Sequence, residues 1–110
     1  MNDVVFVYAT HPNEAGAAVL GRSLVEQGLA ACVNMFPGMR TIYRWEGQIE
    51  TGEETAMIIK TSAGMMDAIQ AHVRANHPYV CPCLVALPVV GGDSAYLSWI
   101  MGSVARSGER

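Results

Sequence analysis

Apolar residues near the start of the chain predict a strand followed by a helix. Val4 to Tyr8 is a continuous apolar run, which is typical of a strand covered on both faces. The stretch from Thr10 to Glu14 has the features of a helix start, because Pro12 suits the first turn and an acidic residue suits the positive end of the helix dipole. Gly28 is placed to end the helix. Its buried stripe is predicted at helical spacing, at Ala17, Leu20 and Leu24.

A long β-hairpin is predicted next. Ala30 to Phe36 is short and apolar, and residues able to pair in a sheet resume from Met39 to Trp45. Between them Pro37-Gly38 indicates a bulge, since proline cannot donate to a strand ladder. Glu46-Gly47 suits a two-residue turn, and a third strand is expected from Gln48 to Thr61. Both arms exceed the usual ~5–6 residues of a strand, so the tip should extend past its own core and contact a neighbouring subunit.

The second half of the chain predicts another helix and a fourth strand. Ser62 can cap the helix, and His77-Pro78 should end it, because the residue before proline is displaced from helical geometry. Cys83 to Val90 is mostly apolar and is expected to form the strand. The buried stripe of this helix is predicted to comprise Ala63, Met66, Ile69 and Val73.

The order of these elements predicts an α+β fold of ferredoxin-like βαββαβ type over a single domain, residues 1–110. Two split β-α-β units form an antiparallel sheet with helices on one face. Gly91-Gly92-Asp93 then turns the chain and caps a short C-terminal helix. The tail at 104–110 is polar and should fray.

Composition narrows the class of protein. Hydrophobic residues make up 51% of the 110 residues and charged residues only 15%, below the roughly 25% usual in soluble domains. Such a chain is expected to form a homo-oligomer with an apolar interface. The net charge of −3 argues against nucleic-acid binding, and no apolar run approaches the ~18 residues that span a membrane. An odd number of cysteines, three, and no basic leader favour free thiols in the cytoplasm.

One short segment, HPYVCPC, carries candidate metal ligands. His77, Cys81 and Cys83 lie within seven residues, and cysteines two apart in an extended chain point the same way. Soft thiolates at this spacing can hold Cu(I) or zinc, with His77 as a third ligand. The alternative is structural: Cys83 would be a small core residue, Cys81 would line the turn, and His77 would cap helix carbonyls. The sequence leaves both interpretations open.

The remaining candidates are scattered along the chain. Cys32 lies in an apolar stretch and is expected to be buried. Lys60 ends an apolar run, where it either reaches solvent along the surface or holds an anionic group. The large aromatic side chains favour subunit contact first and ligand stacking second; they are Tyr43, Trp45, Tyr96 and Trp99. No phosphate-binding loop and no pair of nucleophile and base can be inferred, so a protein without catalytic activity is expected.

Five segments in order resemble the CutA family, the divalent-cation tolerance proteins. They are Leu29 to Asn34 with Pro37-Gly38, Tyr43 to Gly47, Ile59 to Thr61, His77 to Tyr79 and Tyr96 to Ile100. The resemblance covers about residues 4–101. It implies a ferredoxin-like fold, a tight homotrimer similar to that of the PII signalling proteins, and a role in tolerance to divalent metals, with copper the usual candidate and no cofactor required. It also implies an alternative, a regulatory module that binds a small ligand in clefts between subunits.

The resemblance also suggests where such a cleft lies and where this chain departs from the family. The cleft candidates are Cys32, Trp45, Lys60, His77 and Tyr79. Many members carry two carboxylates after the His-Pro-Tyr sequence, where this chain has Val80 and Cys83. Some bacterial members offer a cysteine and a second histidine where this chain has Ala9 and Asn76. The departures weaken the prediction of hard-cation binding and leave soft-metal binding at Cys81 and Cys83 open.

Overall fold

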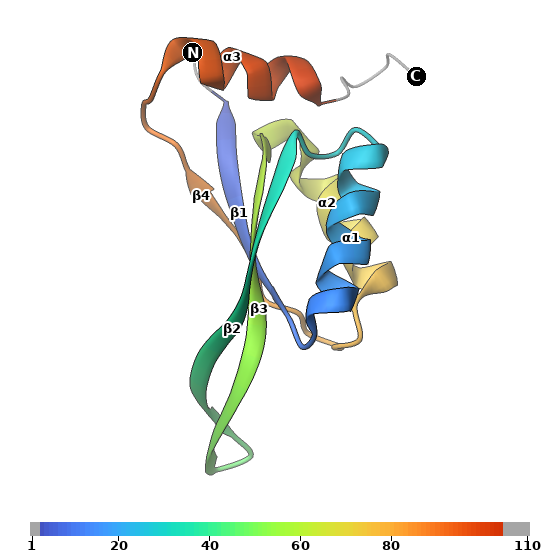
Figure 1. Cartoon of the computed structure of the whole chain (residues 1–110), viewed down its shortest axis with the longest axis vertical. Coiled ribbons are helices and arrows are strands. Elements are labelled where there is room, and N and C mark those ends of the chain that lie inside the picture. Colours follow the sequence, from blue (N-terminus) through green and yellow to red (C-terminus); the bar gives the residue numbers. More distant parts are fainter. Residues whose placement is uncertain (1–2, 105–110) are drawn as a thin grey trace.

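A computed structural model of the chain describes residues 3–104, and it has the expected α+β ferredoxin-like architecture (Figure 1). The four strands form one antiparallel sheet in the order β2-β3-β1-β4, so the first strand in the sequence lies inside the sheet. The elements in chain order are β1 (Val4–His11), α1 (Glu14–Glu26), β2 (Cys32–Trp45), β3 (Gln48–Ser62), a 3₁₀ turn η1 (Ala63–Met65), α2 (Met66–Asn76), β4 (Leu84–Pro88) and α3 (Ser94–Ser103).

The hydrophobic core lies between one face of the sheet and the pair of helices α1 and α2, which run side by side (Figure 1). Alternate residues of β1 and β3 point into it, because successive side chains of a strand face opposite sides. The predicted stripe of α1 is confirmed in full, since all three residues are buried. The core residues are Val7, Ala9, Ala17, Leu20, Leu24, Ala30, Met57, Ile59, Ile69 and Val73.

The first helix begins later than the sequence pattern suggests. Thr10 and His11 were expected to belong to the helix start, but they continue β1 and pair with Ala56 and Thr55 of β3. Asn13 is the residue that caps α1, and its Oδ1 accepts a hydrogen bond of 2.6 Å from the backbone N–H of Gly16. The side-chain cap satisfies one of the free N–H groups at the helix end. The prediction that Gly28 follows the helix is confirmed, because Gly28 has a φ of 74°.

The second helix and the fourth strand are shorter than predicted. Ser62 makes no side-chain capping bond, and the 3₁₀ turn η1 precedes α2. In consequence Ala63 of the predicted stripe is exposed, whereas Ile69 and Val73 are buried. The strand β4 begins at Leu84, so Cys83 lies just before it in an irregular segment. The last helix is capped as predicted, since Asp93 Oδ2 accepts a bond of 2.9 Å from the N–H of Tyr96.

The β2–β3 hairpin extends well beyond the helices, at the bottom of Figure 1. Its register shifts between Phe36 and Met39, which confirms the predicted bulge, and Gly38 there has a φ of 76°. The predicted Glu46-Gly47 turn is also confirmed, with positive φ at both residues. Near the tip Ile42 is 75% and Trp45 63% exposed. The hairpin therefore carries large apolar side chains that its own core does not cover.

The second face of the sheet is apolar, and within residues 3–104 it is covered at one end by α3. Phe6 and Lys60 pair across β1 and β3, and Leu87 pairs with Phe6 from β4. Val85 is 50% and Leu87 48% exposed on this face, and Phe36 of β2 is 54% exposed. Ile100 anchors α3, because it is fully buried.

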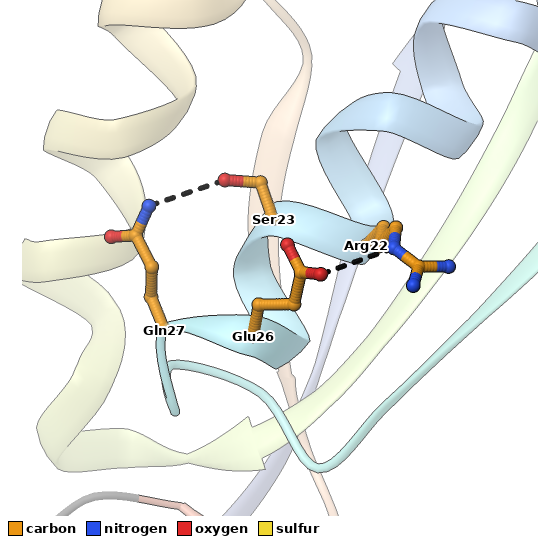
Figure 2. A network of polar contacts seen from close by, with 4 residues as sticks. All are labelled: Arg22, Ser23, Glu26 and Gln27. Atoms are coloured by element: carbon orange, nitrogen blue, oxygen red, sulfur yellow. Dashed lines mark hydrogen bonds and ion pairs between the residues drawn. The ribbon is translucent and has the colours of Figure 1, made fainter.

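Polar side chains form hydrogen bonds and an ion pair on the outer surface of α1, and one of these bonds connects α1 to α2. Arg22 Nε and Glu26 Oε2 form an ion pair of 3.1 Å, and Gln27 Nε2 donates to Ser23 Oγ (Figure 2). The same Ser23 Oγ lies 2.8 Å from Nε2 of His72 in α2. The Arg22–Glu26 pair is largely exposed and contributes only about 0.3–0.5 kcal/mol, as surface pairs one helical turn apart do.

Two further expectations concern membrane-spanning segments and the C-terminal tail. None of the helices in residues 3–104 has the length and apolar character needed to cross a membrane. The tail expected to fray, 104–110, lies outside the described residues except for Val104, which is buried.

Candidate functional site

His77 sits at the junction between the end of α2 and the irregular segment that leads to β4. It is the C-cap residue of α2, with an extended backbone, as the following Pro78 requires. Its side chain is only 9% exposed. The ring lies 4.9 Å from the ring of His11 and 5.1 Å from that of Tyr79, measured between centroids. The end of β1 and the segment after α2 thus meet in a small aromatic cluster, which we call the His11–His77–Tyr79 cluster.

Both nitrogens of the His77 ring have backbone partners. Nε2 lies 2.8 Å from the carbonyl oxygen of Thr10, and Nδ1 accepts a hydrogen bond of 3.1 Å from the N–H of Tyr79. Because a carbonyl can only accept, Nε2 carries the proton and donates it. A metal bound to either nitrogen would have to replace one of these two bonds. In this arrangement His77 therefore holds β1 to the segment after α2.

His11 is packed tightly against the first turn of α1. Its Nδ1 accepts a hydrogen bond of 3.2 Å from the N–H of Asn13, and the residue is only 4% exposed. A methyl group at Gly16 would lie 2.7 Å from His11 Nε2, so glycine is needed for this close approach. Burial lowers the pKa of His11 below its usual 6.5, and the neighbouring His77 lowers it further, while the bond from Asn13 acts in the opposite direction.

The lowered pKa of His11 predicts that acid weakens the fold. Below about pH 6.5 the histidine of the unfolded chain gains a proton while the folded one resists it, so the unfolded state binds more protons. The stabilisation is fully present above that pH and is lost as the pH falls through the folded pKa. We expect the free energy of unfolding, measured in urea from pH 7.5 to 5, to fall more steeply for the wild type than for His11→Gln. Parallel curves would show that His11 does not contribute.

Cys81 and Cys83 are both exposed, which contradicts the interpretation of Cys83 as a core residue. The reason is the late start of β4, which leaves Cys83 outside the sheet. Burial raises the pKa of the Cys83 thiol above its usual value, and the carboxylate of Glu54 raises it further, whereas a hydrogen bond with the Thr10 side chain lowers it. Glu54 has the same effect on the pKa of Tyr79, after burial. Cys83, Thr10 and Glu54 are thus neighbours of the His11–His77–Tyr79 cluster.

The predicted set of three metal ligands is not assembled in the structure. Within residues 3–104 no three side chains of histidine, cysteine, aspartate or glutamate are grouped as a metal site would need. His77 has both nitrogens occupied, while Cys81 and Cys83 are exposed residues outside any disulfide. What the segment offers a metal is a pair of soft ligands, Cys81 and Cys83. Metal binding at His77, Cys81 and Cys83 stays a prediction.

Lys60 and Cys32 lie side by side on the second face of the sheet, as partners in the β2–β3 ladder. The ammonium of Lys60 donates to Tyr96 Oη at 2.9 Å and lies 5.3 Å from the ring centre of Phe6 and 5.4 Å from that of Tyr96. No carboxylate of the described residues forms an ion pair with it. Contrary to expectation Cys32 is only half-buried; Asn34 Nδ2 lies 3.7 Å from its sulfur. The lysine is thus a cation held between two aromatic rings.

The five predicted cleft residues occupy three places in the single chain. Cys32 and Lys60 pair at the end of the hairpin nearest α3, whereas Trp45 pairs with Gln48 at the opposite end, beside the turn. His77 and Tyr79 lie near Thr10, between the two. A cleft that includes all five would need contributions from more than one chain.

Several residues of the site were not identified from the sequence. They are Thr10, His11 and Gly16. One signal was available: His11-Pro12 repeats the His77-Pro78 dipeptide, and it stands where an apolar strand gives way to a helix. Contact between the two histidines depends on the pairing of strands far apart in the sequence, which local patterns do not specify.

Comparison with known proteins gives a consistent result. The model of the CutA1 divalent ion tolerance protein family matches residues 5–103. A protein of Oryza sativa subsp. japonica, "Protein CutA 1, chloroplastic", is 43% identical over 103 residues, which cover 94% of this chain and 58% of that protein. The divalent-cation tolerance protein CutA of Pectobacterium atrosepticum is 44% identical over 102 residues, which cover 93% of each. The crystal structure of CutA1 from Oryza sativa has a TM-score of 0.92 and 42% identity, over 94% of this chain and 95% of that one. The chain therefore spans little more than half the length of the rice relative.

Proposed function

The chain belongs to the CutA1 divalent ion tolerance family, and from that premise we propose that it takes part in metal tolerance as a homotrimer that binds copper without catalysing a reaction. The observation that supports copper is the exposure of two thiols, Cys81 and Cys83, on one short segment. Thiolates are soft ligands and prefer Cu(I) to hard cations such as Mg²⁺. Other soft ions, zinc among them, remain candidates for the same pair.

The role of His77 in such a site is secondary in this proposal. To bind a metal the ring would have to release either the Thr10 carbonyl or the N–H of Tyr79. Leaving a buried polar group without a partner costs about 1–3 kcal/mol. Cu(I) accepts as few as two thiolate ligands, so the thiol pair suffices for binding, and His77 can stay in its structural bonds.

Cu(I) titration of the reduced protein tests this proposal. We expect one Cu(I) per chain to bind in competition with a chromophoric chelator, and the double variant Cys81→Ser/Cys83→Ser to lose that binding. Cys32→Ser is the matched control and should bind like the wild type, because Cys32 lies on another strand. His77→Gln should retain binding if the histidine is not a ligand. Equal competition by the wild type and the double variant would refute the copper proposal.

Association into an oligomer is supported by the apolar surface that the single chain leaves uncovered, and the number of three subunits comes from the family resemblance. One part is the sheet face with Phe36, Val85 and Leu87, and the other is the hairpin tip with Ile42 and Trp45. Apolar surface of this extent is typical of interfaces between subunits. For the predicted cleft to form, association through these surfaces would have to bring Trp45 of one chain toward the site of another.

The mass in solution tests the trimer directly. We expect light scattering to give the mass of three 11.8-kDa chains at micromolar concentration. Trp45→Ser should weaken association, whereas Val19→Ser, which removes a similarly exposed apolar residue from α1, should leave it unchanged. A monomer at all concentrations would contradict the proposal.

A second candidate function rests on Lys60. Its ammonium lacks a carboxylate partner among the described residues and sits beside the stacked rings of Tyr96 and Trp99, 5.8 Å apart. A PII-like regulatory module would use such a group to hold the anionic part of a small ligand in an inter-subunit cleft. A ligand that raises the melting temperature of the wild type but not of Lys60→Met would favour this function over copper binding.

We place the protein in the cytoplasm in this proposal, because free thiols persist in a reducing compartment. The name of the rice relative assigns that protein to the chloroplast. Fractionation of the source cells, followed by detection of the chain, distinguishes the two compartments.

A further inference from the structure

The segment between α2 and β4 presents two thiols that are separated by one proline. Cys81 and Cys83 are both exposed, and residues 77–83 belong to no helix or strand. Pro82 cannot donate a backbone hydrogen bond, so no ladder bond from it is lost when the segment moves. These features distinguish the pair from Cys32, which is fixed in β2 and half-buried.

The spacing permits a bond between the two sulfurs. Residues two apart in a fully extended chain have Cα atoms at most about 7 Å apart, and disulfides join Cα atoms about 4.4–6.8 Å apart. The segment therefore needs little or no local shortening, which a chain outside regular structure can provide. We propose that Cys81 and Cys83 are a reversible dithiol–disulfide switch that exchanges with low-molecular-weight disulfides of the glutathione type.

The exchange proceeds in two balanced steps. The Cys81 thiolate attacks one sulfur of glutathione disulfide, which forms a mixed disulfide and releases one glutathione thiolate that takes up a proton. The Cys83 thiol then loses its proton to water, and the resulting thiolate attacks the Cys81 sulfur and releases the second glutathione as a thiolate, which takes up a proton. Two electrons pass from the protein thiols to the glutathione disulfide. Excess reduced glutathione reverses both steps.

Two properties of the pair make the bond labile. It is exposed, and it closes a ring of only three residues, so loop closure in the unfolded chain adds little to its stability. Strained or exposed disulfides have more oxidising potentials than structural ones, and such bonds serve regulation. We therefore expect the disulfide to open and close within the range of cellular glutathione mixtures.

The switch acts on the site already described. The Cys83 sulfur belongs to the residue just before Leu84, which pairs with Ala9 of β1, so it lies beside Thr10, whose carbonyl accepts from His77. A bond to Cys81 draws that sulfur away from Thr10 and loosens the contact between β1 and the segment after α2. It also removes both thiolates as metal ligands. The switch itself does not depend on copper binding.

Thiol counting in glutathione mixtures tests the switch on the full chain. After equilibration with reduced and oxidised glutathione and an acid quench, free thiols are labelled with a maleimide polymer and the mass of each species is measured. We expect the wild type to go from three labelled thiols to one and to recover all three on reduction. After the mass of the labels is subtracted, the oxidised chain should be lighter than the reduced chain by two hydrogen atoms. Cys32→Ser should go from two to none.

The single variants provide the matched controls. Cys81→Ser and Cys83→Ser each lack the second thiol, so the remaining one should stop as a glutathione adduct. Persistent adducts in the wild type, disulfide-linked dimers, or three labelled thiols in the most oxidising mixture would each overturn the switch. So would loss of both labels in either single variant at a mass lower by two hydrogen atoms, because Cys32 would then be the disulfide partner. If the pair oxidises as expected but the reduced protein binds no Cu(I), the switch stands and the copper proposal fails.

Discussion

Replacing His77 with alanine should lower the free energy of unfolding by about 2–4 kcal/mol, a large share of the stability of a small protein. The carbonyl of Thr10 would lose a donor in a buried place, and the N–H of Tyr79 would lose its acceptor. The ring also fills the space between His11 and Tyr79, so its removal leaves a cavity. Urea unfolding followed by circular dichroism gives the free energy for both proteins.

His72→Ala is the matched control for this change. His72 lies within α2, and its hydrogen bond to Ser23 is only partly buried, so water and Gln27 can take its place. Its loss should lower the free energy of unfolding by at most ~1 kcal/mol. Equal losses for the two variants would show that the His77 bonds do not hold β1 to the segment after α2.

Gly16→Ala should destabilise the protein by about 1–3 kcal/mol, although alanine is the better helix former. The new methyl group would lie 2.7 Å from His11 Nε2 and 2.8 Å from Asn13 Oδ1. Those atoms belong to a buried ring and to the side chain that caps α1. Neither can move without giving up a contact, and loss of the cap alone costs about 1 kcal/mol.

Gly102→Ala separates this steric effect from helix propensity. Gly102 lies in α3, and an added methyl group there would meet nothing within 4 Å. The change should therefore be neutral or stabilise by up to ~1 kcal/mol. Thermal melts of the two variants should shift in opposite directions or differ by several degrees. If Gly16→Ala is as harmless as Gly102→Ala, the close packing of His11 on α1 is not a constraint on the fold.

Much of the fold could be predicted because its signals are local. The Pro37-Gly38 bulge, the Glu46-Gly47 turn and the Asp93 cap each follow from the chemistry of two or three adjacent residues. The predicted boundaries were wrong where a segment of about one helical turn fitted two kinds of element. Thr10 and His11 can start a helix or extend a strand, and the choice was made by pairing with β3, more than forty residues away.

The candidate site was less predictable because it depends on tertiary contacts. The HPYVCPC segment marked His77, but the sequence gives no indication that both ring nitrogens bind backbone atoms. Cys83 resembled a core residue because apolar residues follow it, yet the sheet begins one residue later. Residues such as Trp45 and Lys60 were grouped by resemblance, and the single chain separates them along the hairpin.

The central position of β1 has a consequence for the order of assembly during synthesis. It leaves the ribosome before the other three strands of this sheet, but its partners are β3, with Val4 opposite Ser62, and β4, with Val5 opposite Pro88. At roughly 5–20 residues per second, an apolar strand with two open edges waits several seconds for its neighbours. During that interval, pairing of β1 with a strand of another nascent chain competes with its pairing to β3 and β4, as it does for any unprotected strand edge. The strand of this sheet that is made last, β4, is therefore the one that covers the second open edge of β1.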